Sequence, residues 1–245
     1  MIKFDEIVIL GLEKYPERYL EVEVQLYELQ LKYKVFFSYD KDQILNQSFN
    51  QLNIVPFDCF KNLTPPRRNI KLGALCCTLG HLSIIKYAQM NNLDGILIIE
   101  DDTVLSKDFK EKLKHLEEVP EDADIVYLGS GTSSNKLPKK YKITEHVYNA
   151  QRMNLYCTHC ILITKKGYTR IVNKVLEFED TIDGMLRLGV KNKELIGYTI
   201  VPHLAYQKDG ISLTRLKTKK SVNQAWTKTL FSDDDIISNI QINTK

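Results

Sequence analysis

The chain has 245 residues, of which 43% are hydrophobic and 27% charged, and its net charge is only +3. This composition is typical of a globular protein with a sizeable core, and so small a charge does not by itself indicate a nucleic-acid or membrane surface. Five cysteines without regular spacing argue against a disulfide-stapled secreted fold. The residues after Met1 lack a signal peptide's apolar core, and no window approaches the roughly 20 apolar residues of a spanning helix. We therefore expect a cytoplasmic protein with no transmembrane segment.

The first half of the chain predicts two strands with a helix between them, and then a second helix. The strand patterns occupy residues 7–10 and 35–37. Pro16 suits the first turn of the intervening helix. Apolar residues recur behind it at helical spacing: Leu20, Val24, Tyr27 and Leu31. Residues 41–72 are less regular, and a strong helical pattern follows Gly73.

The second half alternates further strands and helices. Strands are predicted at 96–99, 125–128, 156–163 and 198–201, with helices starting near Ser106 and Thr164. Residues 130–142 are rich in Ser, Gly, Lys and Pro and predict a mobile loop. The alternation indicates an α/β fold with a mainly parallel central sheet flanked by helices. No linker or repeat is visible, so we expect one domain over 1–245, in which 213–245 forms a basic loop plus a terminal helix.

An acidic run, Glu100-Asp101-Asp102, directly follows the apolar residues 96–99. Burying even one unpaired carboxylate costs several kcal/mol, so the three must lie at the strand's carboxyl end, where open α/β sheets hold ligands. Such a cluster suits a hard divalent cation that shares its shell with phosphates. If the segment stays extended, Glu100 and Asp102 share one face as metal ligands and Asp101 turns toward ribose, backbone or water. The alternative is a solvated acidic turn.

Other polar residues near predicted strand ends are candidates for binding a nucleotide. Gly11, Leu12 and Arg18 follow the first strand, where base and ribose can meet backbone. Arg18 either pairs with phosphate or is a solvated helix arginine. Tyr39 and Asp40 end the second strand, and Asp40 either accepts a ribose hydroxyl or uracil N–H or belongs to a simple turn.

Two further histidine and cysteine motifs have competing interpretations. His81 lies within the helix that follows Gly73, and it either orients the acidic run or a phosphate loop or is a hydrogen-bonded core histidine. The run Cys157-Thr158-His159-Cys160 resembles half a zinc site. A closed site needs four suitably spaced ligands, so we expect core cysteines instead.

Six segments in order resemble the motifs of glycosyltransferase family 25, which includes lipooligosaccharide and collagen galactosyltransferases. They are ILGLEKYPER at 9–18, LGALCCTLGHL at 72–82, IIEDD at 98–102, IVYLG at 125–129, TID at 181–183 and PH at 202–203. Two departures are Gly80, where serine is usual, and Thr181, where proline is usual. The resemblance implies a GT-A-type nucleotide-sugar-binding fold. It also implies inverting, Mn²⁺-dependent (or Mg²⁺-dependent) transfer of galactose or glucose from a UDP-sugar to a glycan or hydroxylated acceptor.

The resemblance also implies roles for particular residues. His203 would join Glu100 and Asp102 around the metal, since a neutral imidazole suits a mixed shell. Asp183 would be the general base, with Asp209 as the second choice, although Asp183 could equally cap a helix. Two other functions stay open: a non-catalytic nucleotide-sugar-binding protein of the same fold, and a metal-dependent phosphodiesterase.

Overall fold

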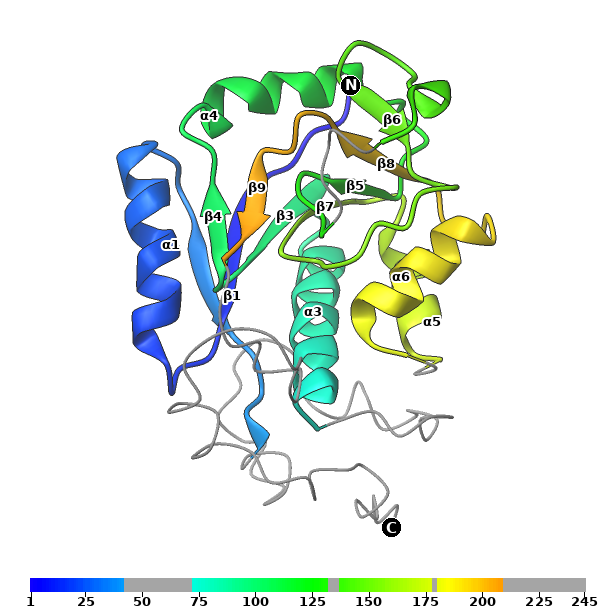
Figure 1. Cartoon of the computed structure of the whole chain (residues 1–245). Helices are drawn as coiled ribbons and strands as arrows, with labels where there is room; N and C mark the ends of the chain where they lie inside the picture. The colour runs from blue at the N-terminus through cyan, green and yellow to red at the C-terminus, as the bar shows by residue number, and fades with distance from the viewer. Residues whose placement is uncertain (42–71, 132–136, 178–179, 209–245) are drawn as a thin grey trace, which may run out of the picture.

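The computed structural model describes residues 1–41, 72–131, 137–177 and 180–208 (Figure 1). A seven-stranded sheet forms its centre, in the order β2-β1-β3-β7-β5-β8-β6. The strands in that order are Lys34–Phe37, Glu6–Gly11, Gly95–Glu100, Cys160–Thr164, Ile125–Tyr127, Gly197–Ile200 and Val147–Asn149. A separate pair joins β4 (Thr103–Leu105) to β9 (Ala205–Gln207).

The sheet is mainly parallel, as predicted. Parallel pairing links β1 to β2, β1 to β3 and β5 to β8, whereas β7 and β6 pair with their neighbours in the antiparallel sense. Five strands therefore run in one direction, and β1, β3, β5 and β8 end at the same edge. The sequence pattern missed β6 and the β4–β9 pair, whose strands of three residues are too short to give a recognisable period.

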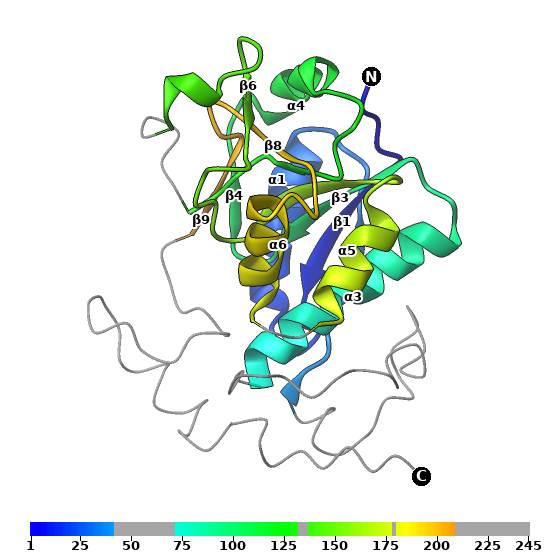
Figure 2. The same cartoon turned by 90° about the vertical axis from the view of Figure 1, so that its right-hand side faces the viewer.

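Helices cover both faces of the sheet (Figures 1 and 2). One face packs against α3 (Leu72–Met90), α5 (Tyr168–Val175) and α6 (Ile182–Lys191). The other packs against α1 (Pro16–Glu28), α4 (Phe109–Lys112) and the 3₁₀ helix η3 (Leu113–Glu118). A short 3₁₀ turn, η5 (Lys139–Tyr141), precedes β6. Side chains of β1 and β3 alternate between the two cores, so both central strands are buried on both faces.

Helix α1 forms where it is predicted, but the predicted apolar stripe is not its buried face. Val22 and Leu26 point into the core, whereas Leu20, Val24 and Tyr27 are 48%, 56% and 79% exposed. The helical spacing therefore identified the element but not its orientation, because Val22 and Leu26 are also one turn apart.

Two predicted boundaries are wrong for backbone reasons. Cys157 has φ 71°, a left-handed conformation that no strand contains, so β7 begins only at Cys160 and not near Tyr156. The helix expected from Ser106 begins at Phe109 with Asp108 as its first flanking residue, and it is a single α-turn that continues as η3. The region 213–245 and the second-choice base Asp209 lie outside the described residues.

Candidate active site at the carboxyl edge of the sheet

The three carboxylates lie where β3 ends, as predicted, but not on one extended segment. Glu100 is the last residue of β3, and Asp101 and Asp102 form the turn that leads into β4. The backbone N–H of Asp101 donates to the carbonyl of Leu10 (3.1 Å), which fixes this acidic turn, residues 100–102, to the end of β1. Because the strand stops at Glu100, the alternation argument for a shared face of Glu100 and Asp102 does not apply.

Asp101 is held by Arg18 from the first turn of α1. Arg18 Nε donates to Oδ2 (2.9 Å) and Nη2 donates to Oδ1 (2.6 Å), a bidentate pair whose side chains are only 22% and 12% exposed. Arg18 Nη2 also lies 3.5 Å from Asp102 Oδ2. Burial raises the pKa of Asp101, and Arg18 opposes that rise. Arg18 is therefore not a solvated helix arginine, and it neutralises part of the acidic turn.

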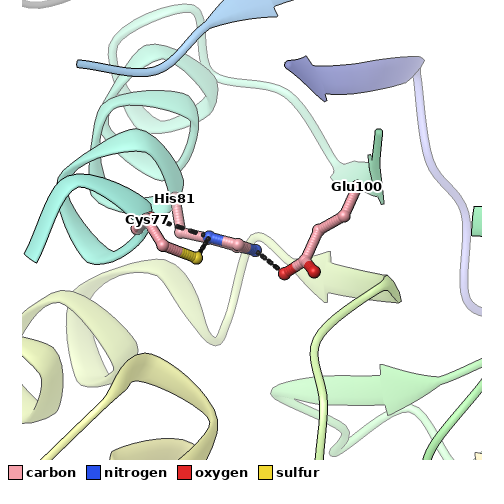
Figure 3. Close-up of side chains that lie close together, drawn as sticks. All are labelled: Cys77, His81 and Glu100. Atoms are coloured by element: carbon pink, nitrogen blue, oxygen red, sulfur yellow. Dashed lines mark hydrogen bonds and ion pairs between the residues drawn. The ribbon is translucent and has the colours of Figure 1, made fainter. Parts of the chain in front are cut away.

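Glu100 is held from two other elements, as Figure 3 shows in part. The Thr158 hydroxyl donates to Oε1 (2.6 Å), and His81 Nε2 lies 3.2 Å from the same oxygen. His81 Nδ1 lies 3.0 Å from the carbonyl of Cys77, so Nε2 is the ring nitrogen that faces Glu100. Burial disfavours the Glu100 anion, but His81 and Thr158 outweigh it and lower its pKa. His81 thus contacts the acidic turn, one of its two predicted roles.

Asp102 carries the unbalanced charge of the site. Its Oδ1 is buried with no hydrogen-bond partner in the described part of the chain, whereas Oδ2 accepts from Gln207 Nε2 (3.1 Å) and lies 3.5 Å from Arg18 Nη2. Burial, Glu100 and Asp101 together raise the pKa of Asp102 to about 7. A desolvated carboxylate beside two others is unfavourable alone, and a bound cation would remove the repulsion.

His203 lies in the loop from β8 to β9. It is 2% exposed, and its Nε2 has no hydrogen-bond partner among the described residues. Burial and the neighbouring His159 lower the pKa of His203 to about 4, so the ring is neutral at pH 7 and offers a lone pair. This state is the one a metal ligand needs, but a neutral core histidine has it too.

Asp183 lies in the first turn of α6, one residue after the helix starts. Thr181, not Asp183, occupies the N-cap position, so the simple capping alternative is wrong. The Thr181 hydroxyl donates to Asp183 Oδ1 (2.5 Å), and the Cys157 backbone N–H donates to Oδ2 (3.4 Å). The carboxylate also acts electrostatically on Cys77, near the start of α3, and on Tyr127 at the end of β5.

The predicted nucleotide-binding residues lie at the same edge of the sheet. Gly11 ends β1 beside β2, and its carbonyl accepts from the Ser38 N–H (2.8 Å). A Cβ on Gly11 would meet the Tyr19 side chain at 3.0 Å. Leu12 and Asp40 are partly exposed, whereas Tyr39 is 2% exposed and packs in the core.

Possible metal-ligand atoms converge within 4.8 Å in two places among the described residues. The groups are Cys77–His81–Glu100 and His115–Glu118–His146. The predicted trio of Glu100, Asp102 and His203 is not one of them, and its assignment stays a prediction. Burial and the nearby carboxylates raise the pKa of Cys77 well above its usual range, so this thiol stays protonated and is a poor ligand.

Sequence reasoning missed the residues that reach the acidic turn from distant parts of the chain. Thr158 and Gln207 bond to Glu100 and Asp102 across 58 and 105 positions, and no local signal marks them. The sequence marks His159 only as part of a cysteine motif. In the structure it is fully buried, and it interacts electrostatically with both Glu100 and His203. Of the described cysteines, Cys76 and Cys160 are buried, as expected, whereas Cys77 and Cys157 are only partly buried.

The match to known proteins agrees with this geometry. A family model described as glycosyltransferase family 25 (LPS biosynthesis protein) matches residues 4–207, and the chain belongs to that family. The chain is 27% identical to human procollagen galactosyltransferase 2 over 141 residues, 56% of this chain and 22% of that protein. A putative glycosyltransferase of Haemophilus influenzae is 29% identical over 122 residues, 42% of this chain and 43% of that protein.

Membership supports glycosyl transfer as the activity, but relatives differ in this respect. The human inactive glycosyltransferase 25 family member 3 is 26% identical over 134 residues, 52% of this chain and 22% of that protein. The matched region spans about a fifth of the procollagen relatives' length. Within the described residues, the helices are too short or too polar to cross a membrane.

Proposed function

We propose that the chain transfers a hexose from a UDP-sugar to a hydroxyl group of a glycan or hydroxylated acceptor, with inversion at the anomeric carbon. The observation that carries the proposal is the acidic turn, in which Asp102 Oδ1 is buried without a partner among the described residues. Galactose is the first choice of sugar, and glucose the second, because similar proteins are named galactosyltransferases.

We propose Mn²⁺, or Mg²⁺ in its place, as the cation of this site. Carboxylate oxygens are the ligands that such hard cations prefer, and diphosphate oxygens of the donor would complete the shell. Asp102 would contribute its unpartnered oxygen and Glu100 its neighbouring carboxylate, with His203 as a neutral nitrogen ligand. The raised pKa of Asp102 supports this fit, since the same electrostatic strain favours a positive charge. When bound, the cation would neutralise charge on the departing UDP.

The protein's own groups would position both substrates. Arg18 holds Asp101 and so keeps the acidic turn fixed against β1. The backbone at Gly11 and Leu12 and the side chain of Asp40 lie at the ends of β1 and β2, where a nucleoside would meet them. Asp183 would take the proton of the acceptor hydroxyl as its oxygen bonds to the anomeric carbon and the bond to UDP breaks. The Thr181 hydroxyl would orient that carboxylate.

A donor and acceptor screen tests the proposal. Full-length protein is incubated with Mn²⁺ and a panel of UDP-sugars, and UDP release is scored with and without glycan or hydroxylysine-containing acceptors. We expect acceptor-dependent release that Asp102→Asn abolishes. Asp108→Asn is a matched control, since Asp108 is a surface carboxylate paired with Lys112.

The alternative functions give different results in the same screen. Cleavage of the diphosphate without any acceptor requirement would favour a phosphodiesterase. Mn²⁺-dependent UDP-sugar binding without turnover would favour a non-catalytic binding protein, as in the relatives named inactive. Absence of any Mn²⁺-dependent donor binding would refute the proposed site.

A further inference from the structure

A second group of ligand-capable side chains lies away from the acidic turn. His115 and Glu118 come from η3, and His146 comes from the residue before β6. We name these three residues the His–Glu–His cluster. In the sheet order β6 is four strands from β3, roughly 19 Å at the usual strand spacing. Figures 1 and 2 show β6 beside the helical segment that begins with α4. The cluster is therefore separate from the proposed catalytic site.

The contacts of Glu118 bring both imidazoles to one oxygen. His146 Nδ1 lies 2.6 Å and His115 Nδ1 lies 3.1 Å from Oε1. The other oxygen, Oε2, accepts from the Thr144 hydroxyl (2.6 Å) and from the His146 backbone N–H (3.1 Å). One carboxylate oxygen and two ring nitrogens thus converge, while the second oxygen is fixed by two donors. Hydrogen-bonded carboxylates and histidines of this kind are typical of metal sites.

The spacing of these atoms is close to that of a tetrahedral site. Bond lengths of about 2.0–2.1 Å place neighbouring ligand atoms about 3.3 Å apart. The distance from Oε1 to His115 Nδ1, 3.1 Å, would therefore grow by about 0.2 Å, and the distance to His146 Nδ1, 2.6 Å, by about 0.7 Å. The rings now stack, with centroids 3.6 Å apart and planes 24° apart. A metal bonds in the plane of an imidazole, so one ring must turn. His146 has the room to do so, since its side chain is 25% exposed compared with 10% for His115.

A cavity of about 520 Å³ opens beside the cluster. Besides the three cluster residues, the acidic side chains of Asp108, Glu111 and Glu117 line it together with Lys112 and Lys114. The cavity leaves space for water at a fourth coordination position.

We propose that the His–Glu–His cluster binds a divalent transition-metal ion of the zinc class. Its ligands are Nδ1 of His115, Nδ1 of His146 and Oε1 of Glu118, with the fourth position open to the cavity. As metal ligands, both Nδ1 atoms would have to be free of protons, with the proton of each ring on Nε2. Two imidazoles favour Zn²⁺ over Mn²⁺ or Mg²⁺, whereas the carboxylates of the acidic turn have the opposite preference. The ion cross-links η3 to the start of the edge strand β6.

Calorimetry with Zn²⁺ alone tests this site in the full, metal-stripped chain. We expect wild-type protein to bind Zn²⁺ at a site whose affinity falls more than about 100-fold in His146→Gln and about 10- to 100-fold in Thr144→Val. Zn²⁺ should also raise the melting temperature of the wild type but not of His146→Gln. Cys77→Ser is the control for the other ligand group, and it should keep this site.

Three outcomes would overturn the proposal: no Zn²⁺ binding by the wild type, unchanged Zn²⁺ affinity in His146→Gln, or loss of binding only in Cys77→Ser. Circular dichroism without metal checks that His146→Gln is folded. If it is not, Thr144→Val decides the question, because this variant leaves all three ligands in place and removes only the hydroxyl that orients Glu118.

Discussion

The acidic turn and the His–Glu–His cluster place a carboxylate in opposite surroundings. Asp102 is buried beside two other carboxylates, and its pKa rises to about 7. Glu118 accepts hydrogen bonds from Thr144, His115 and both the ring and backbone of His146. Although burial opposes it, these donors lower the pKa of Glu118 to about 2. In the first site one arginine, Arg18, leaves the charge of the three carboxylates unbalanced, whereas the carboxylate of the second site is satisfied without a ligand.

This difference separates two ways in which a site can be prepared for a cation. In the acidic turn the repulsion between the carboxylates favours binding of a cation. Without a cation, the other interactions of the folded chain must outweigh this repulsion. In the His–Glu–His cluster the donors of the protein already hold the carboxylate, and a metal has to displace two imidazole protons from it. The two sites should therefore respond in opposite directions to loss of a carboxylate charge.

The largest expected effect concerns Asp183, the carboxylate that is proposed to take the proton of the acceptor. Asp183→Asn should lower glycosyl transfer by roughly 10²- to 10⁴-fold, because the amide cannot take the acceptor's proton. Donor and Mn²⁺ affinity should stay nearly unchanged, and stability should fall by no more than about 1 kcal/mol, the value of an anion near a helix N-terminus. Single-turnover rates, calorimetry and melting curves on one preparation separate these effects. A mutant with native turnover would exclude Asp183 and make Asp209 the next residue to test.

The second effect tests whether Glu118 is a satisfied structural carboxylate. Glu118→Ala removes the acceptor for Thr144 and His146 and should cost roughly 1–3 kcal/mol of unfolding free energy at pH 7. Because the folded-state pKa is lowered, this contribution is present above the unfolded pKa of about 4.3 and is lost as pH falls toward 2. Urea unfolding at pH 7 and pH 4 should therefore show a smaller difference at pH 4. Exposed Glu117→Ala is the matched control, and an equal loss in both variants would contradict the assignment.

The third expected effect is an increase in the free energy of unfolding, whereas Glu118→Ala should lower it. Asp102→Asn should stabilise the metal-free protein by on the order of 1–2 kcal/mol at pH 8, because it removes a buried charge. The folded-state pKa is about 7, above the unfolded value of about 3.9, so the wild type loses stability as pH rises through that window. At pH 5 the gain should be smaller. Urea unfolding in the presence of a chelator measures this gain in stability, with Asp108→Asn as the surface control. A destabilised Asp102→Asn at pH 8 would mean that the carboxylate is satisfied after all.

The same contrast explains how much of the molecule the sequence predicts. The order of strands and helices, the end of β3 and the three carboxylates are visible as local patterns, because an apolar run followed by acids has few possible placements. The partners are not visible: Thr158 and Gln207 reach the acidic turn from distant elements, and His146 reaches Glu118 across 28 positions. The sequence also does not show which face of a helix is buried when both faces carry apolar residues, as in α1.

The smallest expected effect concerns Arg18, which reduces the charge imbalance of the acidic turn. Arg18→Lys keeps the positive charge but loses the bidentate hydrogen bonding to Asp101, since an ammonium group cannot bind both carboxylate oxygens in this geometry. We expect a loss of roughly 0.5–1 kcal/mol at pH 8. A weaker partner would let burial raise the pKa of Asp101 further. A carboxyl whose folded pKa rises loses stability with increasing pH, so the deficit should be smaller at pH 5.

Exposed Arg152→Lys is the matched control for this substitution, and it should change stability at neither pH. Urea unfolding of both variants in chelator measures the difference, and Mn²⁺ calorimetry on the same samples measures the site. If Arg18 acts by holding the turn, Arg18→Lys should weaken Mn²⁺ binding only a few-fold, far less than Asp102→Asn. A deficit at pH 5 as large as at pH 8 would mean that Arg18 stabilises the helix α1 packing and not the carboxylates. In that case the charge of the acidic turn would have to be balanced by another group.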